Sequence, residues 1–390
     1  MGIIRNFIKG TDHALFWLCV FVSAFGVLLV YSATLSKTDS GQLFSRDVIV
    51  MAAAVVLGLL LCLVISWFDY EAILRFWFII AGVSILLMLL LFVFGTGPSE
   101  RSDVRTWLPL RLGSFSLFFQ PSELLKFAFI ITFSLHLDYV GSDINRPLNL
   151  LLLGVHAAIP TLLVVVTGDL GSAIVFVMIF GAMMFIANVK LRYFILAGAA
   201  ALAAVPLVWV KVFNDIQRDR FLALIYPDNY PDIIYQQKQG RIAMGTGGLF
   251  GSGLFEGLHV QNGLVPEAKN DMILAVAGEE LGFIGCMALM LMFLFIILRI
   301  VRTARYCVDV PGKMLCCGVA AMIASQLIVN VGMCLMLLPV IGITLPFVSA
   351  GGSSNLCVYL AMGLVFSVYR HNIERTPVDF RIISVIKSEV

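Results

Sequence analysis

The chain has 390 residues, of which 60% are hydrophobic and 13% are charged. Soluble domains carry about 25% charged residues, so the composition excludes an ordinary soluble protein. The formal net charge of +2 gives no information about partners. We therefore expect a protein that crosses a membrane several times.

Apolar runs of about 20 residues, the length that crosses about 30 Å of hydrocarbon, recur along the chain. They predict an all-α polytopic membrane protein with one membrane domain, residues 1–390. We place ten transmembrane helices near residues 13–33, 46–66, 73–95, 120–137, 149–167, 170–188, 192–212, 272–300, 314–338 and 345–369. Seven spans thus lie within 13–212 and three within 272–369. Two connections are long, 96–119 and 213–271.

The lysines and arginines of the connections predict the orientation, because cytoplasmic connections are enriched in both residues. With the N-terminus inside, the short outer connections hold only Lys37 and Arg46. We therefore expect both termini in the cytoplasm, including the tail 370–390, and both long connections outside.

The eight cysteines form no CxxC pair, which indicates small packing residues rather than disulfides or zinc ligands. The five histidines lack the spacing of a metal site. Neither a Walker A motif nor a GxSxG elbow occurs. Nothing here indicates a nucleotide-driven pump.

The first long connection places three arginines around a tryptophan and leads into "QPSELLK". The basic and aromatic residues are Arg101, Arg105, Trp107 and Arg111. Pro121 suits the first turn of a helix, and Glu123 and Lys126 then share one helical face. They form either an internal ion pair or part of a working cavity, and we favour the cavity because ionisable groups within a span are costly.

The second long connection is rich in glycine, in "IAMGTGGLFGSGLFEG". A phosphate-binding fingerprint would need a preceding strand, which the pattern does not predict. We instead expect a tightly turning loop that packs close to helices or lines a cavity.

Asp271 lies immediately before the eighth apolar run, and Glu279 and Glu280 follow about two helical turns later. One interpretation makes Asp271 a helix cap and pairs the glutamates with lysines or arginines of neighbouring spans. The other makes Asp271 a general base beside an anion-binding patch that includes Lys269. Spacing alone leaves both open.

The stretch "LPFVSAGGSSNL" interrupts the outer end of the tenth span with glycines and serines. Its serines Ser349, Ser353 and Ser354 can satisfy backbone groups that a broken helix frees. We expect this broken end to shape the same outer cavity.

Five stretches in series resemble one known family. They are QPSELLK, DLGSA, IAMGTGGLFGSGL, PEAKNDMILAVAGEELG and LPFVSAGGSS, and together they are similar to the SEDS proteins (shape, elongation, division and sporulation), typified by RodA and FtsW. The resemblance runs from the third span to the C-terminus and includes a large outer loop between the seventh and eighth of ten spans. It implies the SEDS-type helical bundle.

The resemblance implies a peptidoglycan glycosyltransferase that polymerises lipid II into glycan strands outside the bacterial cytoplasmic membrane, in elongation, division or sporulation. It implies a class B penicillin-binding transpeptidase and other elongation or division proteins as partners, besides the lipid bilayer, and no nucleic acid. The family's essential acid falls on Asp271, its conserved Glu and Lys on Glu123 and Lys126, its loop tryptophan on Trp107, and its acid pair on Glu279 and Glu280. The chain departs from the family pattern at Thr106, Asn270, Ala350 and Thr167-Gly168, which indicates a divergent branch.

The expected chemistry makes Asp271 the base for the acceptor 4-hydroxyl. The candidates for holding the pyrophosphate are Arg101, Arg105, Arg111, Lys126 and Lys269. We expect no metal bound by the protein alone, although a magnesium ion held with the pyrophosphate is compatible with these residues. The alternatives are a lipid II flippase, which needs no base, and a non-catalytic scaffold for a transpeptidase.

Overall fold

The computed structural model describes residues 10–35, 43–97, 104–112 and 115–375. Within these residues, nine helices are long and apolar enough to cross a membrane, and α8 is a shorter apolar helix. Together they correspond to the ten predicted spans. The ten are α2 (His13–Thr34), α3 (Arg46–Trp67), α5 (Trp77–Phe94), α6 (Pro121–Val140), α7 (Pro147–Val166), α8 (Leu170–Ile186), α9 (Leu191–Lys211), α13 (Ile273–Arg305), α14 (Val310–Cys334) and α15 (Gly352–Arg375).

Local sequence explains where many helices begin. Asp12, Ser45 and Asp169 accept a hydrogen bond from a backbone N–H three residues later, which satisfies a donor that the helix leaves unpaired. Pro121 and Pro147 occupy the first turns of α6 and α7, where the missing N–H costs nothing.

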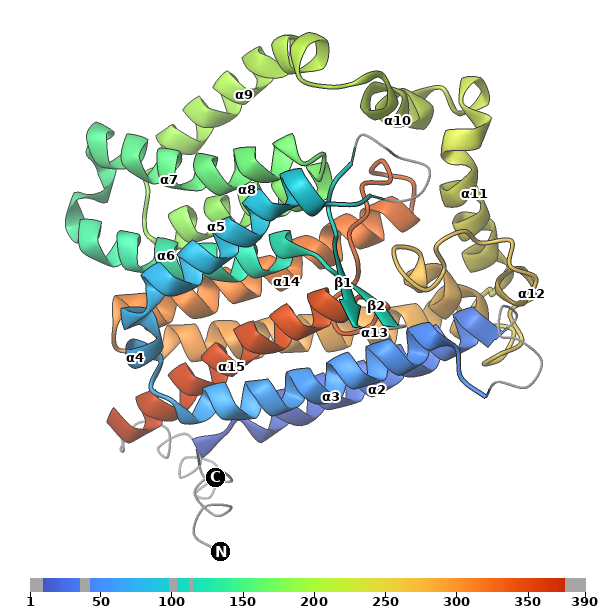
Figure 1. Ribbon diagram of the computed structural model, residues 1–390, viewed down its shortest axis with the longest axis horizontal. Coiled ribbons are helices and arrows are strands. Elements are labelled where there is room, and N and C mark those ends of the chain that lie inside the picture. Colours follow the sequence, from blue (N-terminus) through green and yellow to red (C-terminus); the bar gives the residue numbers. More distant parts are fainter. Residues whose placement is uncertain (1–9, 36–42, 98–103, 113–114, 376–390) are drawn as a thin grey trace, which may run out of the picture.

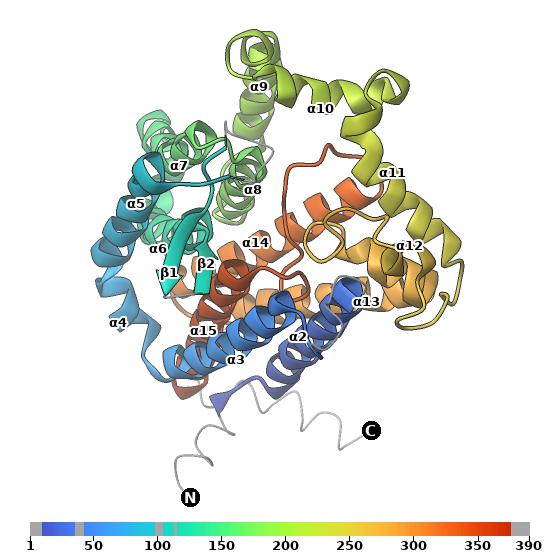
Figure 2. The same cartoon turned by 45° about the vertical axis from the view of Figure 1, so that its right-hand side comes forward.

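The helices α14 and α15 form the centre of the bundle (Figures 1 and 2). They are the most buried of the long apolar helices, and α3 packs along α15 while α13, α8 and α6 pack on α14. By contrast α9, which lies wholly within the described residues, has no buried side chain. Figure 2 shows α9 at the edge of the bundle, above α8 and leading into α10. Its apolar surface is therefore available to lipid.

The beginning of α2 and the end of α15 lie on the same side of the molecule, since Gly10 is in contact with the side chain of Arg370. An even number of spans requires this arrangement. All eight cysteines are described and unpaired, and six are buried, which confirms their role as packing residues.

The two long connections are more ordered than the sequence indicates. The first contains a hairpin of β1 (Leu108–Leu112) and β2 (Phe115–Phe119), in which Leu108 is opposite Phe119. Within the described residues, this hairpin and an isolated bridge between Thr96 and Trp107 are the departures from an all-α fold. The second contains α10 (Asp215–Ile225), α11 (Pro231–Thr246), α12 (Leu258–Gln261) and a short 3-10 helix, Pro227–Asn229. The remaining short elements are α4 (Tyr70–Arg75) and the 3-10 helix Gly141–Asn145.

Two predicted span boundaries were wrong. The tenth helix begins at Gly352 rather than 345, because residues 335–351 form an irregular connection. The eighth span is interrupted at Gly282, whose φ of 68° and ψ of −167° are not helical. Residues 283–305 alone span about 34 Å at a rise of 1.5 Å per residue, enough to cross the hydrocarbon.

The glycine-rich loop fills this interruption. The N–H groups of Ser252 and Gly253 donate to the carbonyls of residues 279 and 280, at 2.9 and 3.0 Å. In return the N–H groups of residues 283 and 284 donate to the carbonyls of residues 248 and 249. These are the groups that an unbroken helix would have paired with one another. A Cβ on Gly251 would lie 2.1 Å from the carbonyl oxygen of Glu280, so the loop approaches at a distance that only glycine permits. The prediction of a loop packed close to helices is confirmed.

Candidate active site

The backbone of Asp271 and the two residues before it is held by two elements, the connection 335–351 and α14. The carbonyl oxygens of residues 269–271 accept, in order, the N–H of Ala350 at 2.9 Å, the hydroxyl of Ser349 at 2.7 Å and the amide of Asn330 at 2.9 Å. Each donor belongs to the connection 335–351 or to α14. The position of Asp271 is therefore fixed by tertiary contacts rather than by a helix cap.

The carboxyl group of Asp271 is partly buried and faces Gly342 in the same connection. A Cβ on Gly342 would lie 3.7 Å from Asp271 Oδ2, and Gly342 has a φ of +73°. The pKa of Asp271 is raised to about 7, mainly by burial and also by the neighbouring Glu267, while Arg220 acts to lower it. The carboxylate of Asp169 also raises it. A carboxyl group with a pKa near neutrality can exchange a proton at physiological pH.

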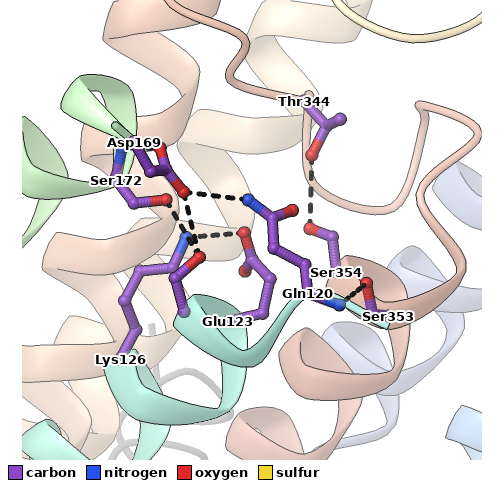
Figure 3. Close-up of polar contacts among 9 residues, drawn as sticks. Gln120, Glu123, Lys126, Asp169, Ser172, Thr344, Ser353 and Ser354 are labelled. Atoms are coloured by element: carbon purple, nitrogen blue, oxygen red, sulfur yellow. Dashed lines mark hydrogen bonds and ion pairs between the residues drawn. The ribbon is translucent and has the colours of Figure 1, made fainter. Parts of the chain in front are cut away.

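A polar cluster surrounds Asp169 at the beginning of α8 (Figure 3). Its Oδ2 accepts from Gln120 Nε2 at 3.0 Å and from the Ser122 hydroxyl at 3.1 Å, and its Oδ1 accepts the N–H of Ser172 at 2.9 Å. One turn along α6, Lys126 Nζ lies 2.8 Å from Glu123 Oε1, and both side chains are buried. Both interpretations of Glu123 and Lys126 stay open, because they form an internal ion pair and this pair lies beside the polar cluster.

The serines at the start of α15 and in the connection before it contact these parts. The backbone N–H of Gln120 donates to the Ser353 hydroxyl at 3.3 Å, and Thr344 donates to the Ser354 hydroxyl at 3.3 Å. Figure 3 shows both contacts beside the Glu123 and Lys126 pair. Ser353 thus contacts the start of α6, Ser349 contacts the residue before Asp271, and Ser354 bonds within its own stretch of chain. A role of these serines towards a substrate stays a prediction.

Two of the predicted cations whose side chains the structure describes, Arg105 and Lys269, bond elsewhere than at the carboxyl group of Asp271. Arg105 is exposed, donates to the carbonyl of Phe92 at 2.6 Å, and its N–H bonds to the carbonyl of Thr167. Lys269 forms an ion pair of 2.6 Å with Asp47 of α3, so it fastens the loop to the bundle.

Three predicted residues of the first connection give less information. Arg101 lies outside the described residues, and Arg111 lies in β1 with a side chain that is also outside them. Trp107 is partly buried, and its ring lies 6.1 Å from that of Phe118. The hairpin thus places the tryptophan in an aromatic contact, and its role towards a substrate stays a prediction.

Glu279 and Glu280 are buried at the helix interruption, each 1% exposed. Glu279 accepts the N–H groups of His259 and Val260 at 2.7 and 2.9 Å and lies 3.0 Å from the His259 ring. Glu280 accepts the hydroxyl of Ser32 and the amide of Gln261. Among the described residues, neither glutamate forms the pair with lysine or arginine that one of the two interpretations offered. These contacts support a structural role, joining α12 and α2 to α13, rather than contact with substrate.

A small cavity opens beside Asp169, between the beginning of α8, α10 and the connection 335–351. Gly168, Gln217, Arg220 and Ile341 contribute to its wall. Arg220 also donates to the carbonyl of Val340 at 2.6 Å. Arg220 thus places a guanidinium group near Asp271. No pattern in the sequence had indicated this residue.

The sequence analysis missed three residues of the site, Asp169, Arg220 and Asn330. Asp169 carries a recognisable signal, because an aspartate three residues before a serine at the start of an apolar run is typical of a helix N-cap. Arg220 and Asn330 carry no such signal, since their contacts join segments distant in sequence. Among the described residues, no group of three or more His, Cys, Asp or Glu side chains could hold a metal ion.

Residues 13–374 match the family of cell cycle proteins that comprises FtsW, RodA and SpoVE. This match covers most of the chain, and the protein belongs to that family of multi-pass membrane proteins.

Two relatives cover nearly the whole chain. One is the probable peptidoglycan glycosyltransferase FtsW of Geobacter sulfurreducens, 33% identical over 375 residues, which are 94% of this chain and 97% of the relative. The other is the peptidoglycan glycosyltransferase MrdB of Escherichia coli, 30% identical over 354 residues, which are 88% and 91% of the two chains.

Solved structures share the fold. A chain from a study of polymerization and crosslinking by a peptidoglycan synthase complex superposes with a TM-score of 0.76 at 25% identity, covering 93% of this chain and 98% of its own. The rod shape determining protein RodA of Thermus thermophilus superposes with a TM-score of 0.67 at 24% identity, covering 93% and 97%.

Proposed function

We propose that this protein is a peptidoglycan glycosyltransferase that polymerises lipid II into glycan strands, with Asp271 as its general base. The named activity of relatives that match almost end to end supports the reaction. The observation that carries the site is the placement of Asp271, a partly buried carboxyl group with a pKa of about 7, held by three separate backbone contacts.

In the proposed reaction, the 4-hydroxyl oxygen of the acceptor sugar forms a bond to the anomeric carbon of the donor. The bond from that carbon to the lipid pyrophosphate breaks, and the pyrophosphate leaves with the bonding electrons. The hydroxyl proton passes to the carboxylate of Asp271. A base with a pKa near the working pH is suited to this transfer, because it is largely ionised yet still attracts the proton.

The leaving pyrophosphate gains negative charge, which cationic donors can stabilise. Arg220 lines the cavity beside Asp169, and a guanidinium group can contact phosphate oxygens in bidentate fashion. The side chains of Arg101 and Arg111 stay candidates from the sequence. Lys126 is buried in an ion pair with Glu123. We therefore assign this pair a supporting role, in which its two charges set the electrostatic environment beside the site.

A divalent ion at this site would need ligands from the substrate or water in addition to protein side chains. Asp169 already accepts three hydrogen bonds, and the described residues provide no cluster of metal ligands. The residues present therefore do not fit a magnesium ion bound by the protein alone, and the proposed step does not use one.

We further infer the setting of the reaction. The bias of lysine and arginine supports an enzyme with both termini in the cytoplasm and its site at the outer face of the bacterial cytoplasmic membrane. The exposed apolar surface of α9 supports an approach of the polyprenyl chains from the lipid. The solved relative was studied as a peptidoglycan synthase complex, which supports a class B penicillin-binding transpeptidase as partner, with other elongation or division proteins.

The experiment that tests the activity uses purified protein and lipid II in detergent micelles, with and without a candidate transpeptidase. Micelles have no two leaflets, so a flippase would leave lipid II unchanged there. Glycan polymer on a gel supports the glycosyltransferase. Unchanged lipid II, with the partner bound and folding verified, would contradict it.

A further inference from the structure

Asn330 lies near the C-terminal end of α14 and is fully buried. Its side-chain amide nitrogen donates to two carbonyl oxygens, that of Asp271 at 2.9 Å and that of Ile343 at 2.8 Å. The two acceptors are distant in sequence, one at the end of the large loop and one in the connection 335–351. A single amide group therefore joins the two segments that face each other across the carboxyl group of Asp271.

The rest of the connection 335–351 is held in a similar manner. Gln237 of α11 donates to the carbonyls of Met333 and Leu338, both at 2.8 Å, and Arg220 of α10 donates to that of Val340. Each of these side chains bonds to α14 or to the connection. Only Asn330, among the side-chain contacts described, bonds to the connection and to Asp271 together.

We infer that Asn330 is a positioning residue that sets the carboxyl group of Asp271 against Gly342, an inference that rests on the proposed function for its catalytic consequence. Asn330 does not touch the reacting atoms. It acts through two main-chain carbonyls, which no aspartate in its place could bond, because a carboxylate has no donor.

Loss of the amide removes one hydrogen bond from each segment at once, while the contacts of Ala350 and Ser349 with residues 269 and 270 remain. In Asn330→Ala the carbonyls of Asp271 and Ile343 lose a buried donor, which such groups need. The carboxyl group of Asp271 then becomes more accessible to water and moves relative to its charged neighbours. Those neighbours are Glu267 on its own segment, Arg220 on α10 and Asp169 at the start of α8.

The same helix offers a matched control. Gln326 lies one turn earlier in α14 and is also fully buried, and its amide nitrogen and oxygen have no hydrogen-bond partner among the described residues. Gln326→Ala therefore removes a buried amide without breaking a contact to Asp271. Any general effect of a shortened side chain in α14 appears in both variants.

We expect Asn330→Ala to lower kcat for lipid II polymerisation by roughly 10- to 100-fold, since misplacement by about 1 Å has that effect, with little change in KM. The pH at which the rate is half-maximal falls in Asn330→Ala, because a more hydrated Asp271 has a lower pKa. Gln326→Ala keeps the wild-type kcat and the wild-type midpoint. Equal kcat and equal midpoints in wild type and Asn330→Ala would overturn the inference while leaving the proposed function in place.

Hydrogen exchange followed by mass spectrometry decides the structural part without reference to activity. We expect faster exchange in both peptides 267–273 and 339–345 of Asn330→Ala, and wild-type exchange in Gln326→Ala. Unchanged exchange in either peptide would contradict the inference. If wild type makes no polymer, the proposed function fails. The exchange data still establish or refute the link that Asn330 makes between the two segments.

Discussion

Lys126 and Glu123 form an ion pair of 2.8 Å in which the lysine side chain is fully enclosed and the glutamate is 5% exposed. Taking two charges into an apolar bundle is costly, and only their mutual contact and nearby polar groups offset that cost. Glu123 directly follows Ser122, which donates to Asp169. A change in one partner therefore leaves a buried charge next to the candidate site.

Replacement of one partner should destabilise the protein more than replacement of both. We expect Lys126→Met to lower the free energy of unfolding by about 3–5 kcal/mol, because Glu123 is then buried without a counter-charge. The double variant Glu123→Gln/Lys126→Met should recover most of that loss. Thermal unfolding in detergent measures both. Lys190→Met, at an exposed lysine, controls for loss of a charge, and equal melting temperatures for the single and double variants would contradict this account.

The glycine loop offers a test of the close approach at the helix interruption. A Cβ on Gly247 would lie 2.0 Å from the carbonyl oxygen of Gly278, whereas a Cβ on Gly245 meets nothing within 4 Å. We therefore expect Gly247→Ala to fold poorly and Gly245→Ala to be as stable as wild type or up to about 1 kcal/mol more stable. Size-exclusion profiles and melting temperatures distinguish them. A well-folded Gly247→Ala protein would show that the loop does not pack as described.

Asp271 should lower stability when it is ionised. Its pKa rises from the ordinary value of 3.8 to about 7 in the fold, so the folded state holds the proton more tightly than the unfolded state. The resulting stabilisation is fully present below pH 3.8 and is lost as the pH rises through about 7.

Asp271→Asn stays uncharged and should therefore melt above wild type at pH 8, by roughly a few degrees. The difference should narrow as the pH falls towards 4. Asp228→Asn, at an exposed aspartate, controls for the change in net charge. A lower melting temperature of Asp271→Asn at pH 8 would speak against a buried carboxylate.

The rate of polymerisation should rise with pH and level off above about 7, because only ionised Asp271 can accept the proton. The charged neighbours of Asp271 should shift the pH midpoint of the rate in opposite directions. Glu267→Gln removes a negative charge and should move it to lower pH, while Arg220→Gln removes a positive charge and should move it to higher pH. Initial rates from pH 5.5 to 9 measure this, and shifts of the same sign would be inconsistent with the assignment.

Hydrophobic runs predicted the spans well because membrane length and apolar composition are local properties of a sequence. The interruption at Gly282 was not predicted, since "EELGFIG" continues a helical pattern and the break depends on hydrogen bonds from residues 248–253. Likewise "LPFVSAGGSS" signalled a broken helix end, yet its first helical residue, Gly352, is set by contacts with Gln120 and Asn270.

The candidate site was predicted only in part, again because only local features can be read from a sequence. Asp271, Glu123 and Lys126 stand out because charges beside or within apolar runs are rare. The partners of Lys269 and Arg105 could not be read from the chain, since Asp47 and the carbonyl of Phe92 are brought near by folding. Arg220 and Asn330 were overlooked for lack of any local pattern.

The most direct test of Asp271 as the base of a lipid II polymerase compares wild type and Asp271→Asn, both reconstituted with the same partner and shown to be folded, in their initial rates of glycan polymer formation at pH 8. We expect polymer from wild type and a rate lower by at least about 100-fold in Asp271→Asn, in line with the size of general-base contributions. Polymerisation by Asp271→Asn at the wild-type rate would contradict the assignment of Asp271 as the base.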